Sequence, residues 1–345
     1  MKIDGYLGAD LGEAVARTGE LEALGYDGAF TSEGPHEPFL PLALAAEHSQ
    51  TLELMTNIAV AFARSPLDLA QLANDVQLAS RGRFILGVGS QIRPHIEKRF
   101  SMPWTSPARR MAELVLAIKA IQRSWQEGGP LEFRGEFYRH TLMTPFFSPG
   151  PNEWGAPPVF VAALGPLMTE VAAEVGDGLL IHPFHSGEFV RSHSVPAVER
   201  GLARATQAGT DKPRDSFTLA ATAILATGSD DAAMARADAG VRTLLAFYGS
   251  TPAYRVVLDA HGWGELQTDL NRLSKEGRWA EMASIIPDEV VDALVVRGAP
   301  ADIAAKVEER YAGVVDRLSF STPYAVDPPT VAALMAGFTG TSRGR

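Results

Sequence analysis

The chain has 345 residues, of which 46% are hydrophobic and 21% charged, a composition that excludes extensive disorder. The formal net charge of −10 disfavours non-specific binding to nucleic acids or to anionic membranes. The net charge does not exclude an anionic small-molecule ligand, because the residues of a pocket set the local electrostatic field. The lack of cysteine excludes disulfides, a thiol nucleophile and thiolate metal ligands.

Strand-like and helix-like segments alternate along the chain. Short apolar runs predict eight strands, at residues 2–7, 26–31, 52–61, 84–88, 158–163, 177–182, 217–226 and 315–321. Amphipathic segments predict helices at residues 10–24, 39–49, 107–126, 167–175 and 300–311, with another that opens at Arg64-Ser65-Pro66. Eight strands interleaved with helices indicate an α/β protein with a (β/α)8 TIM barrel.

The length suits one barrel with insertions, so we expect a single domain over residues 1–338. Residues 128–157 are rich in glycine and proline and predict an inserted hairpin at 131–138. Residues 230–294 are too long for one crossover helix and indicate either an extra helical bundle or a moving lid. We expect residues 339–345 to form a flexible tail.

The first residues of the chain and the length of its apolar runs indicate where in the cell the protein is expected. The first residues lack the basic and apolar regions of a secretion signal, and no apolar run reaches membrane-spanning length. We therefore expect a cytoplasmic protein that does not insert into a membrane.

The segment 78–91 passes from a helix end through Gly82 into the fourth strand. Gly82 stands where a helix carboxyl end favours a left-handed residue. The strand then opens into Gly89-Ser90-Gln91, small residues whose backbone a ligand can approach closely.

The reactive face of such a barrel lies at the carboxyl ends of its strands. The residues that follow the strands combine small loops, apolar walls and a few polar side chains: Glu33, His36, Phe62, Arg64, Ser90, Gln91, Arg93, His95, Leu164, Gly165, His182, His185, Thr322 and Tyr324. This set suits a flat, partly anionic organic cofactor better than a metal. No His-Glu-x-x-His motif or paired carboxylates support a metal site, and Gly87-Val88-Gly89 lacks the third glycine of a dinucleotide loop.

Several motifs resemble the luciferase-like family of flavin- and deazaflavin-dependent oxidoreductases. They cover residues 1–335 in the family's order: SRGRFILGVGSQ at 80–91, MTNIAV at 55–60, AALGP at 162–166 and DGLL at 177–180. Thr31-Ser32-Glu33 and Gly165-Pro166 most resemble the actinobacterial branch that uses the deazaflavin coenzyme F420. The resemblance implies a bacterial-luciferase-like barrel.

The resemblance implies that Asn57–Ile58 is a non-prolyl cis peptide, forming a bulge against one face of the cofactor ring. The alternative is an ordinary trans strand. Gly89 to Ile92 are expected along the ring edge, with Ser90 and Gln91 as polar contacts; the alternative is a solvated loop.

Ala163, Leu164 and Gly165 match the family's phosphate-binding turn, in which backbone N–H groups hold the cofactor phosphate at a helix N-terminus. Pro166 adjoins this turn but has no N–H to offer. Plain helix capping is the alternative. The turn lacks the Ser and Thr hydroxyls that flavin-using luciferases place there, which favours F420 over FMN. His182 is expected either to contact the cofactor or to pack at the core edge.

Glu33 and His36 are the catalytic candidates. Glu33 matches an acidic position near the pyrimidine end of the ring, where it would accept a hydrogen bond or move a proton. His36 would act as a general acid or base, or alternatively would structure its proline-flanked turn. Gly34 and Ile92 stand where some deazaflavin dehydrogenases carry a catalytic His and a Glu, so the sugar-phosphate dehydrogenase mechanism does not transfer.

For two further groups of residues the sequence leaves two roles each. Arg64 and Arg93 would meet the cofactor's phosphate or polyglutamate tail, or form surface salt bridges. Large side chains of the 230–294 insertion are packing residues, some of which would wall an apolar substrate pocket: Leu244, Leu245, Phe247, Tyr248 and Trp263.

The sequence therefore favours an F420-dependent oxidoreductase that moves hydride between the deazaflavin and an unidentified small organic substrate. One alternative is an FMN-dependent monooxygenase of the same family. Another is a non-catalytic cofactor-binding member. Family members are often dimers, so a homodimer is possible.

Overall fold

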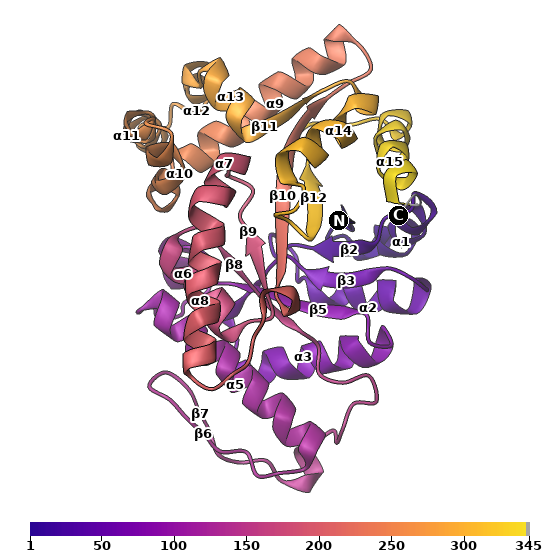
Figure 1. The fold of residues 1–345 in the computed structure, drawn as a ribbon, viewed down its shortest axis with the longest axis vertical. Helices are drawn as coiled ribbons and strands as arrows, with labels where there is room; N and C mark the ends of the chain where they lie inside the picture. Colours follow the sequence, from indigo (N-terminus) through magenta and orange to yellow (C-terminus); the bar gives the residue numbers. More distant parts are fainter. Residues whose placement is uncertain (343–345) are drawn as a thin grey trace.

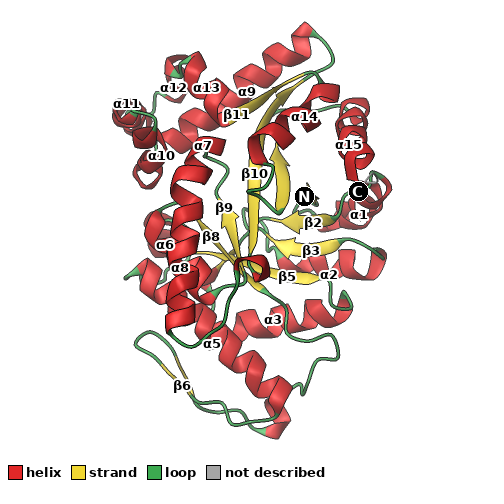
Figure 2. Cartoon of the chain, viewed as in Figure 1, coloured by secondary structure: helices red, strands yellow, loops and turns green. Residues whose placement is uncertain are grey.

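The computed structural model describes residues 1–342, with side chains described through residue 338. In this part of the chain, eight parallel strands close into a barrel (Figures 1 and 2). They are β1 (Lys2–Tyr6), β2 (Gly28–Thr31), β3 (Glu53–Thr56) with its continuation β4 (Ala59–Val60), β5 (Phe84–Gly89), β8 (Val159–Ala163), β9 (Gly178–Ile181), β10 (Thr218–Thr227) and β12 (Arg317–Ser321). Strand β1 pairs with β12, and β10 pairs with both β9 and β12, which closes the ring. The predicted (β/α)8 barrel is confirmed.

Helices cover the outside of the barrel (Figure 2). They are α1 (Leu11–Ala23), α2 (Phe39–His48), α3 (Pro66–Ala79), α5 (Pro107–Glu127), α6 (Pro166–Val175), α8 (Val195–Gln207), α14 (Pro300–Tyr311) and α15 (Pro328–Ser342). Local chemistry sets where they start. In α3, for example, Ser65 Oγ accepts the Asp68 N–H at 3.1 Å, and Pro66 occupies the first turn, where its missing N–H costs nothing.

The strands are buried on both faces, as their apolar runs predict. All six residues of β5 are buried. Inside the barrel one apolar layer fills the interior, made of Phe30, Met55, Ile85, Phe160, Leu180 and Ala220. A larger core lies between the strands and the surrounding helices. The barrel is therefore a packed scaffold that leaves the loops at its ends to carry the chemistry.

Two long segments interrupt the alternation of strands and helices. Residues 128–157 carry a short hairpin of β6 (Phe133–Arg134) and β7 (Arg139–His140). Residues 230–294 form a helical bundle of α9 (Asp231–Gly249), α10 (Arg255–Ala260), α11 (Gly264–Lys275), α12 (Trp279–Met282) and α13 (Asp288–Leu294). This bundle has its own apolar core, which also takes in Leu164 and Phe184 from the barrel end.

Five of the described α-helices and β-strands were not expected from the sequence. They are β11 (Val295–Gly298), which pairs with the last four residues of β10, and the helices α4 (Arg93–Lys98), α7 (Gly187–Phe189), α8 and α15. Helix α15 takes in residues 339–342 of the segment expected to be a flexible tail, and residues 343–345 lie outside the described residues. Within the described chain, no helix is both long and apolar enough to cross a membrane.

Candidate cofactor site at the carboxyl ends of the strands

The third strand of the barrel is broken at its carboxyl end, where the family resemblance implies a bulge. The Asn57–Ile58 peptide is cis, as predicted, and it separates β3 from β4. Asn57 donates its N–H to Thr31 O at 2.7 Å, and Ile58 O accepts the N–H of Glu33 at 3.1 Å. Strand β2 and the loop after it therefore hold the bulge in place.

Ile58 turns toward Gly89 at the end of β5. A Cβ on Gly89 would lie 2.9 Å from Ile58 Cγ1 and 3.4 Å from the Ala162 Cβ. Only glycine at this position leaves room for the Ile58 side chain. Ile58 and Ala162 also pack on the interior apolar layer. The structure thus brings Ile58, Gly89 and Ala162 together as an apolar floor at the barrel mouth.

Glu33 braces this floor. Its Oε2 accepts the Val60 N–H at 2.7 Å and Arg64 Nη1 at 2.6 Å, while its own N–H holds Ile58 O. The side chains of Glu33 and Arg64 are only 6% and 14% exposed. Glu33 therefore holds the chain at Ile58 and Val60, directly after the cis bond. Arg64 is engaged in this internal ion pair, which favours the salt-bridge alternative over a contact with a cofactor tail.

His36 lies in an exposed part of the loop after β2, and no hydrogen bond joins its ring to another described residue. The loop is organised by other groups. Glu37 Oε2 accepts the N–H groups of Phe39 and Leu40, and Thr31 Oγ1 donates to Pro38 O. His36 is consequently accessible to solvent and is not needed to shape the turn.

The loop after β5 is held by contacts within itself. Gln91 has a positive φ of 60°, and its Oε1 accepts the Ile92 N–H at 3.0 Å. Ser90 Oγ donates to Gln91 O at 3.1 Å. All three residues are half-buried. Arg93 beyond them pairs with Glu97 on the surface, its side chain 67% exposed.

The turn after β8 leads directly into α6, whose first residue is Pro166. The first N–H groups of a helix have no partner within it; here these are the N–H groups of Leu167 and Met168. A Cβ at Gly165 would meet nothing within 4 Å, so the backbone at this end is open. Leu164, by contrast, is buried in the core of the helical bundle. An open helix N-terminus beside a barrel mouth fits a phosphate group.

His182 follows β9 next to this turn, and its N–H donates to Ala163 O. Its Nδ1 accepts the Phe184 N–H at 3.2 Å, which leaves the ring proton on Nε2. The ring lies against Tyr254, with centroids 4.2 Å apart, and against Tyr248 at 4.8 Å. Burial, with the nearby His185, lowers the pKa of His182 to about 3. His182 is therefore a neutral ring that offers Nε2–H as a donor.

His185 holds the backbone of His182 through a hydrogen bond. Its Nδ1 donates to His182 O at 2.7 Å, and its Nε2 accepts the Tyr311 hydroxyl at 3.2 Å. Burial lowers the pKa of His185 to about 4. Both ring nitrogens are thus occupied inside the protein, and His185 has a structural role. Among the described residues, no group of His, Asp or Glu side chains forms a metal site.

Sequence reasoning missed the partners of two site residues. Tyr254 was not singled out, although it packs closely on His182, and Tyr248 was read chiefly as a packing residue. The pairing of Glu33 with Arg64 was not foreseen either. Each pair joins residues far apart in the chain, and no local spacing indicates such contacts.

The residues of this site fit a flat cofactor that carries a phosphate. The floor of Ile58, Gly89 and Ala162 is apolar, the α6 N-terminus is open, and His182 presents a fixed donor. A (β/α)8 barrel with these features at the carboxyl ends of its strands is typical of a protein that binds a flat, phosphorylated organic cofactor at the barrel mouth. The chain belongs to the luciferase-like monooxygenase family, which matches residues 2–317.

Similar proteins agree with this assignment. An uncharacterized protein of Mycobacterium tuberculosis is 52% identical over 318 residues, 92% of each chain. A second protein of the same organism, described as a putative coenzyme F420-dependent oxidoreductase, is 28% identical over 80% of this chain and 81% of its own length. Among solved structures, the F420-dependent tetrahydromethanopterin reductase of Methanopyrus kandleri superimposes with a TM-score of 0.76 at 20% identity, covering 97% of each chain.

Proposed function

We propose that the protein is an F420-dependent oxidoreductase that transfers hydride between the deazaflavin and a small organic substrate. The observation that carries the proposal is the open N-terminus of α6, which lies beside the apolar floor of Ile58, Gly89 and Ala162. The relative described as F420-dependent supports the choice of cofactor. When bound, F420 supplies the hydride chemistry, and the protein supplies binding and orientation.

The residues of the site divide this work among them. The Ile58 bulge and Gly89 would lie against the cofactor ring and leave its other face to the substrate. The N–H groups of Leu167 and Met168 would hold the phosphate through charge-assisted hydrogen bonds. His182 donates from Nε2, and because its ring stays neutral, it does so without adding a charge that varies with pH.

Glu33 and His36 take different roles in this proposal. Because the Glu33 carboxylate is engaged with Val60 and Arg64, we assign it as a positioning residue that keeps the bulge in register. His36 is exposed, which leaves it as the general acid or base. The Ser90–Ile92 loop then borders the ring edge, chiefly through backbone groups.

The family's description as monooxygenases supports a second candidate, an FMN-dependent enzyme that activates oxygen. The two candidates differ in their chemistry, because a deazaflavin has carbon in place of the nitrogen that makes reduced flavin react with oxygen. The phosphate turn, with no Ser or Thr between residues 162 and 167, favours the deazaflavin.

The test is a pair of titrations on the purified protein, one with F420 and one with FMN, followed by cofactor fluorescence. We expect saturable binding of F420 at micromolar concentration or tighter, and FMN binding at least tenfold weaker. Oxidation of reduced F420 by alcohol-derived ketones, imines, enones or quinones would then establish turnover. Tight FMN binding with no response to F420 would refute the proposal, whereas F420 binding without turnover would favour a non-catalytic binder.

A further inference from the structure

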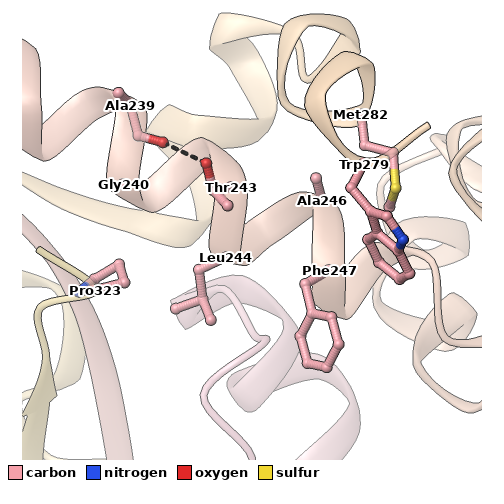
Figure 3. A pocket seen from close by; sticks show the side chains of 9 residues that line it. All are labelled: Ala239, Gly240, Thr243, Leu244, Ala246, Phe247, Trp279, Met282 and Pro323. Carbon is pink, nitrogen blue, oxygen red and sulfur yellow. Dashed lines mark hydrogen bonds between the residues drawn. The ribbon is translucent and has the colours of Figure 1, made fainter. Parts of the chain in front are cut away.

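A cavity of about 550 Å³ lies between α9 and α12 (Figure 3). The residues that line it are Ala239, Gly240, Thr243, Leu244, Ala246, Phe247, Trp279, Met282 and Pro323. Its volume falls within the range of roughly 300–1,000 Å³ typical of small-molecule sites. We infer that this cavity receives the substrate, and that the substrate is an uncharged, largely apolar molecule. The inference rests on the proposed function, whose substrate it specifies.

The cavity lies at the same end of the barrel as the cofactor site. Pro323 follows the carboxyl end of β12, and α9 follows the carboxyl end of β10. Gly240 lets α9 approach the loop after β12, because a Cβ there would come within 2.9 Å of Pro323 O. The Tyr324 hydroxyl accepts the Thr227 N–H at 2.8 Å, which ties this loop to the end of β10. One side of the cavity is therefore fixed to the barrel rim.

A chain of aromatic rings joins the cavity to His182. The ring centroids of His182 and Tyr248 are 4.8 Å apart, those of Tyr248 and Phe247 are 5.7 Å apart, and those of Phe247 and Trp279 are 6.5 Å apart. The wall of the cavity thus continues into the ring that offers its Nε2–H at the cofactor site. Tyr248 is the one ring between Phe247, in the cavity lining, and His182.

The lining excludes charged ligands. None of its nine residues, all within the described chain, carries a charge. The one hydroxyl, Thr243 Oγ1, donates to Ala239 O at 2.9 Å within its own helix (Figure 3). A phosphate or a sugar would leave water here without gaining matching hydrogen bonds, so its binding is disfavoured.

The aromatic side chains offer the surface that an apolar ligand needs. Figure 3 shows Leu244 and Phe247 leaving the same side of α9, with Trp279 and Met282 close to Phe247. Phe247 and Trp279 are each 53% exposed, although both are large and apolar. Their rings are inclined at 38°. A flat apolar molecule would cover the exposed surfaces of both rings, and the flexible side chain of Met282 would adapt to its shape.

The test uses N-phenyl-1-naphthylamine, an uncharged probe that fluoresces in apolar sites, titrated into the purified protein without cofactor. We expect saturable binding by the wild type and at least tenfold weaker binding by Thr243→Arg, which places a charge in the cavity from an exposed position. Ala235→Arg is the matched control, exposed on the same helix but outside the lining, and should bind within twofold of wild type. Trp279→Ala, at a half-exposed ring, should bind at least threefold more weakly and serves if the arginine variant misfolds.

Competition identifies the ligand class. 2-Phenylethanol should displace the probe, and glucose 6-phosphate at the same concentration should not. Equal probe affinity in the wild type, Thr243→Arg and Trp279→Ala would overturn the inference, as would displacement by the sugar phosphate in preference to the alcohol. F420 affinity, measured separately, should stay within twofold in Thr243→Arg. If F420 binds but the variants do not weaken probe binding, the inference about the cavity is refuted and the proposed function is not. If the variants weaken probe binding but F420 does not bind, the proposed function is refuted and the cavity remains a site for apolar ligands.

Discussion

Removing the Glu33 carboxylate should loosen the bulge on which the proposed cofactor site depends. Glu33→Ala deletes the acceptor for the buried Val60 N–H and the partner of Arg64 Nη1, at 2.7 and 2.6 Å. A hydrogen bond to a charged group contributes about 1.5–3 kcal/mol, and an unsatisfied buried N–H costs about 1–3 kcal/mol. Because Arg64 keeps Glu37 and Asp68 within 4 Å, we expect a loss near the lower end of the sum, about 3 kcal/mol.

Glu33→Gln is the matched variant for this carboxylate. It keeps an oxygen for the Val60 N–H and loses only the charge, so we expect a loss of about 1–2 kcal/mol. Urea denaturation at pH 7 measures both variants. In a double-mutant cycle, Glu33→Gln and Arg64→Met should show a coupling of at least about 1 kcal/mol, because they remove the same contact.

The same variants show whether Glu33 positions the bulge or transfers a proton. If Glu33 positions the bulge, Glu33→Gln weakens F420 binding and leaves the pH dependence of turnover in its wild-type form. Wild-type stability in Glu33→Ala would refute the bracing role. Loss of turnover in Glu33→Gln with a changed pH profile, unaltered F420 affinity and unaltered stability would make Glu33 a catalytic residue instead.

Three substitutions test other parts of the site. Gly87→Ala should prevent folding, because its Cβ would lie 1.8 Å from Thr56 O, and expression with circular dichroism checks this. Gly89→Ala should fold but bind F420 several-fold more weakly, since it displaces the Ile58 side chain; unchanged affinity would contradict the floor. The pKa of His182 is about 3 when folded against a usual value near 6.5, so the unfolded chain takes up the proton first. The free energy of unfolding should therefore fall as the pH drops below about 6.5, by at most about 1.4 kcal/mol per pH unit for this group. His182→Gln should make that slope shallower in urea denaturation between pH 7 and 4.5, with the part due to His185 remaining, and an unchanged slope would mean that His182 is not buried as described.

The barrel could be predicted because its strands carry a local signal. A run such as Phe84–Gly89 is apolar at every position, and the helices between such runs show amphipathic periodicity. Helix α8 has the same kind of periodicity, with Ala197, Val198, Leu202 and Ala205 buried, so its signal was available. Strand β11 had no such local signal, because it follows α13 without a turn and its extended backbone is stabilised by pairing with β10.

The site was predictable where a motif fixes it and unpredictable where distant residues meet. The cis Asn57–Ile58 peptide and the glycine at position 89 lie within recognisable segments. The engagement of Glu33 by Arg64 depends on how the loops after β2 and β4 meet. The role expected for Glu33 changes with that contact, because its carboxylate is engaged by Val60 and Arg64 and holds the chain in place.

The central claim, that the N-terminus of α6 holds the phosphate of a deazaflavin, is tested most directly by a charge at Leu167. This side chain is 68% exposed in the first turn of α6. Leu167→Asp adds a negative charge that suits the helix dipole, so stability should be kept, but the charge repels a phosphate. We expect F420 affinity about tenfold lower than in the uncharged, near-isosteric Leu167→Asn, a ratio that corresponds to about 1.4 kcal/mol. Equal F420 affinity in the two variants would contradict the account.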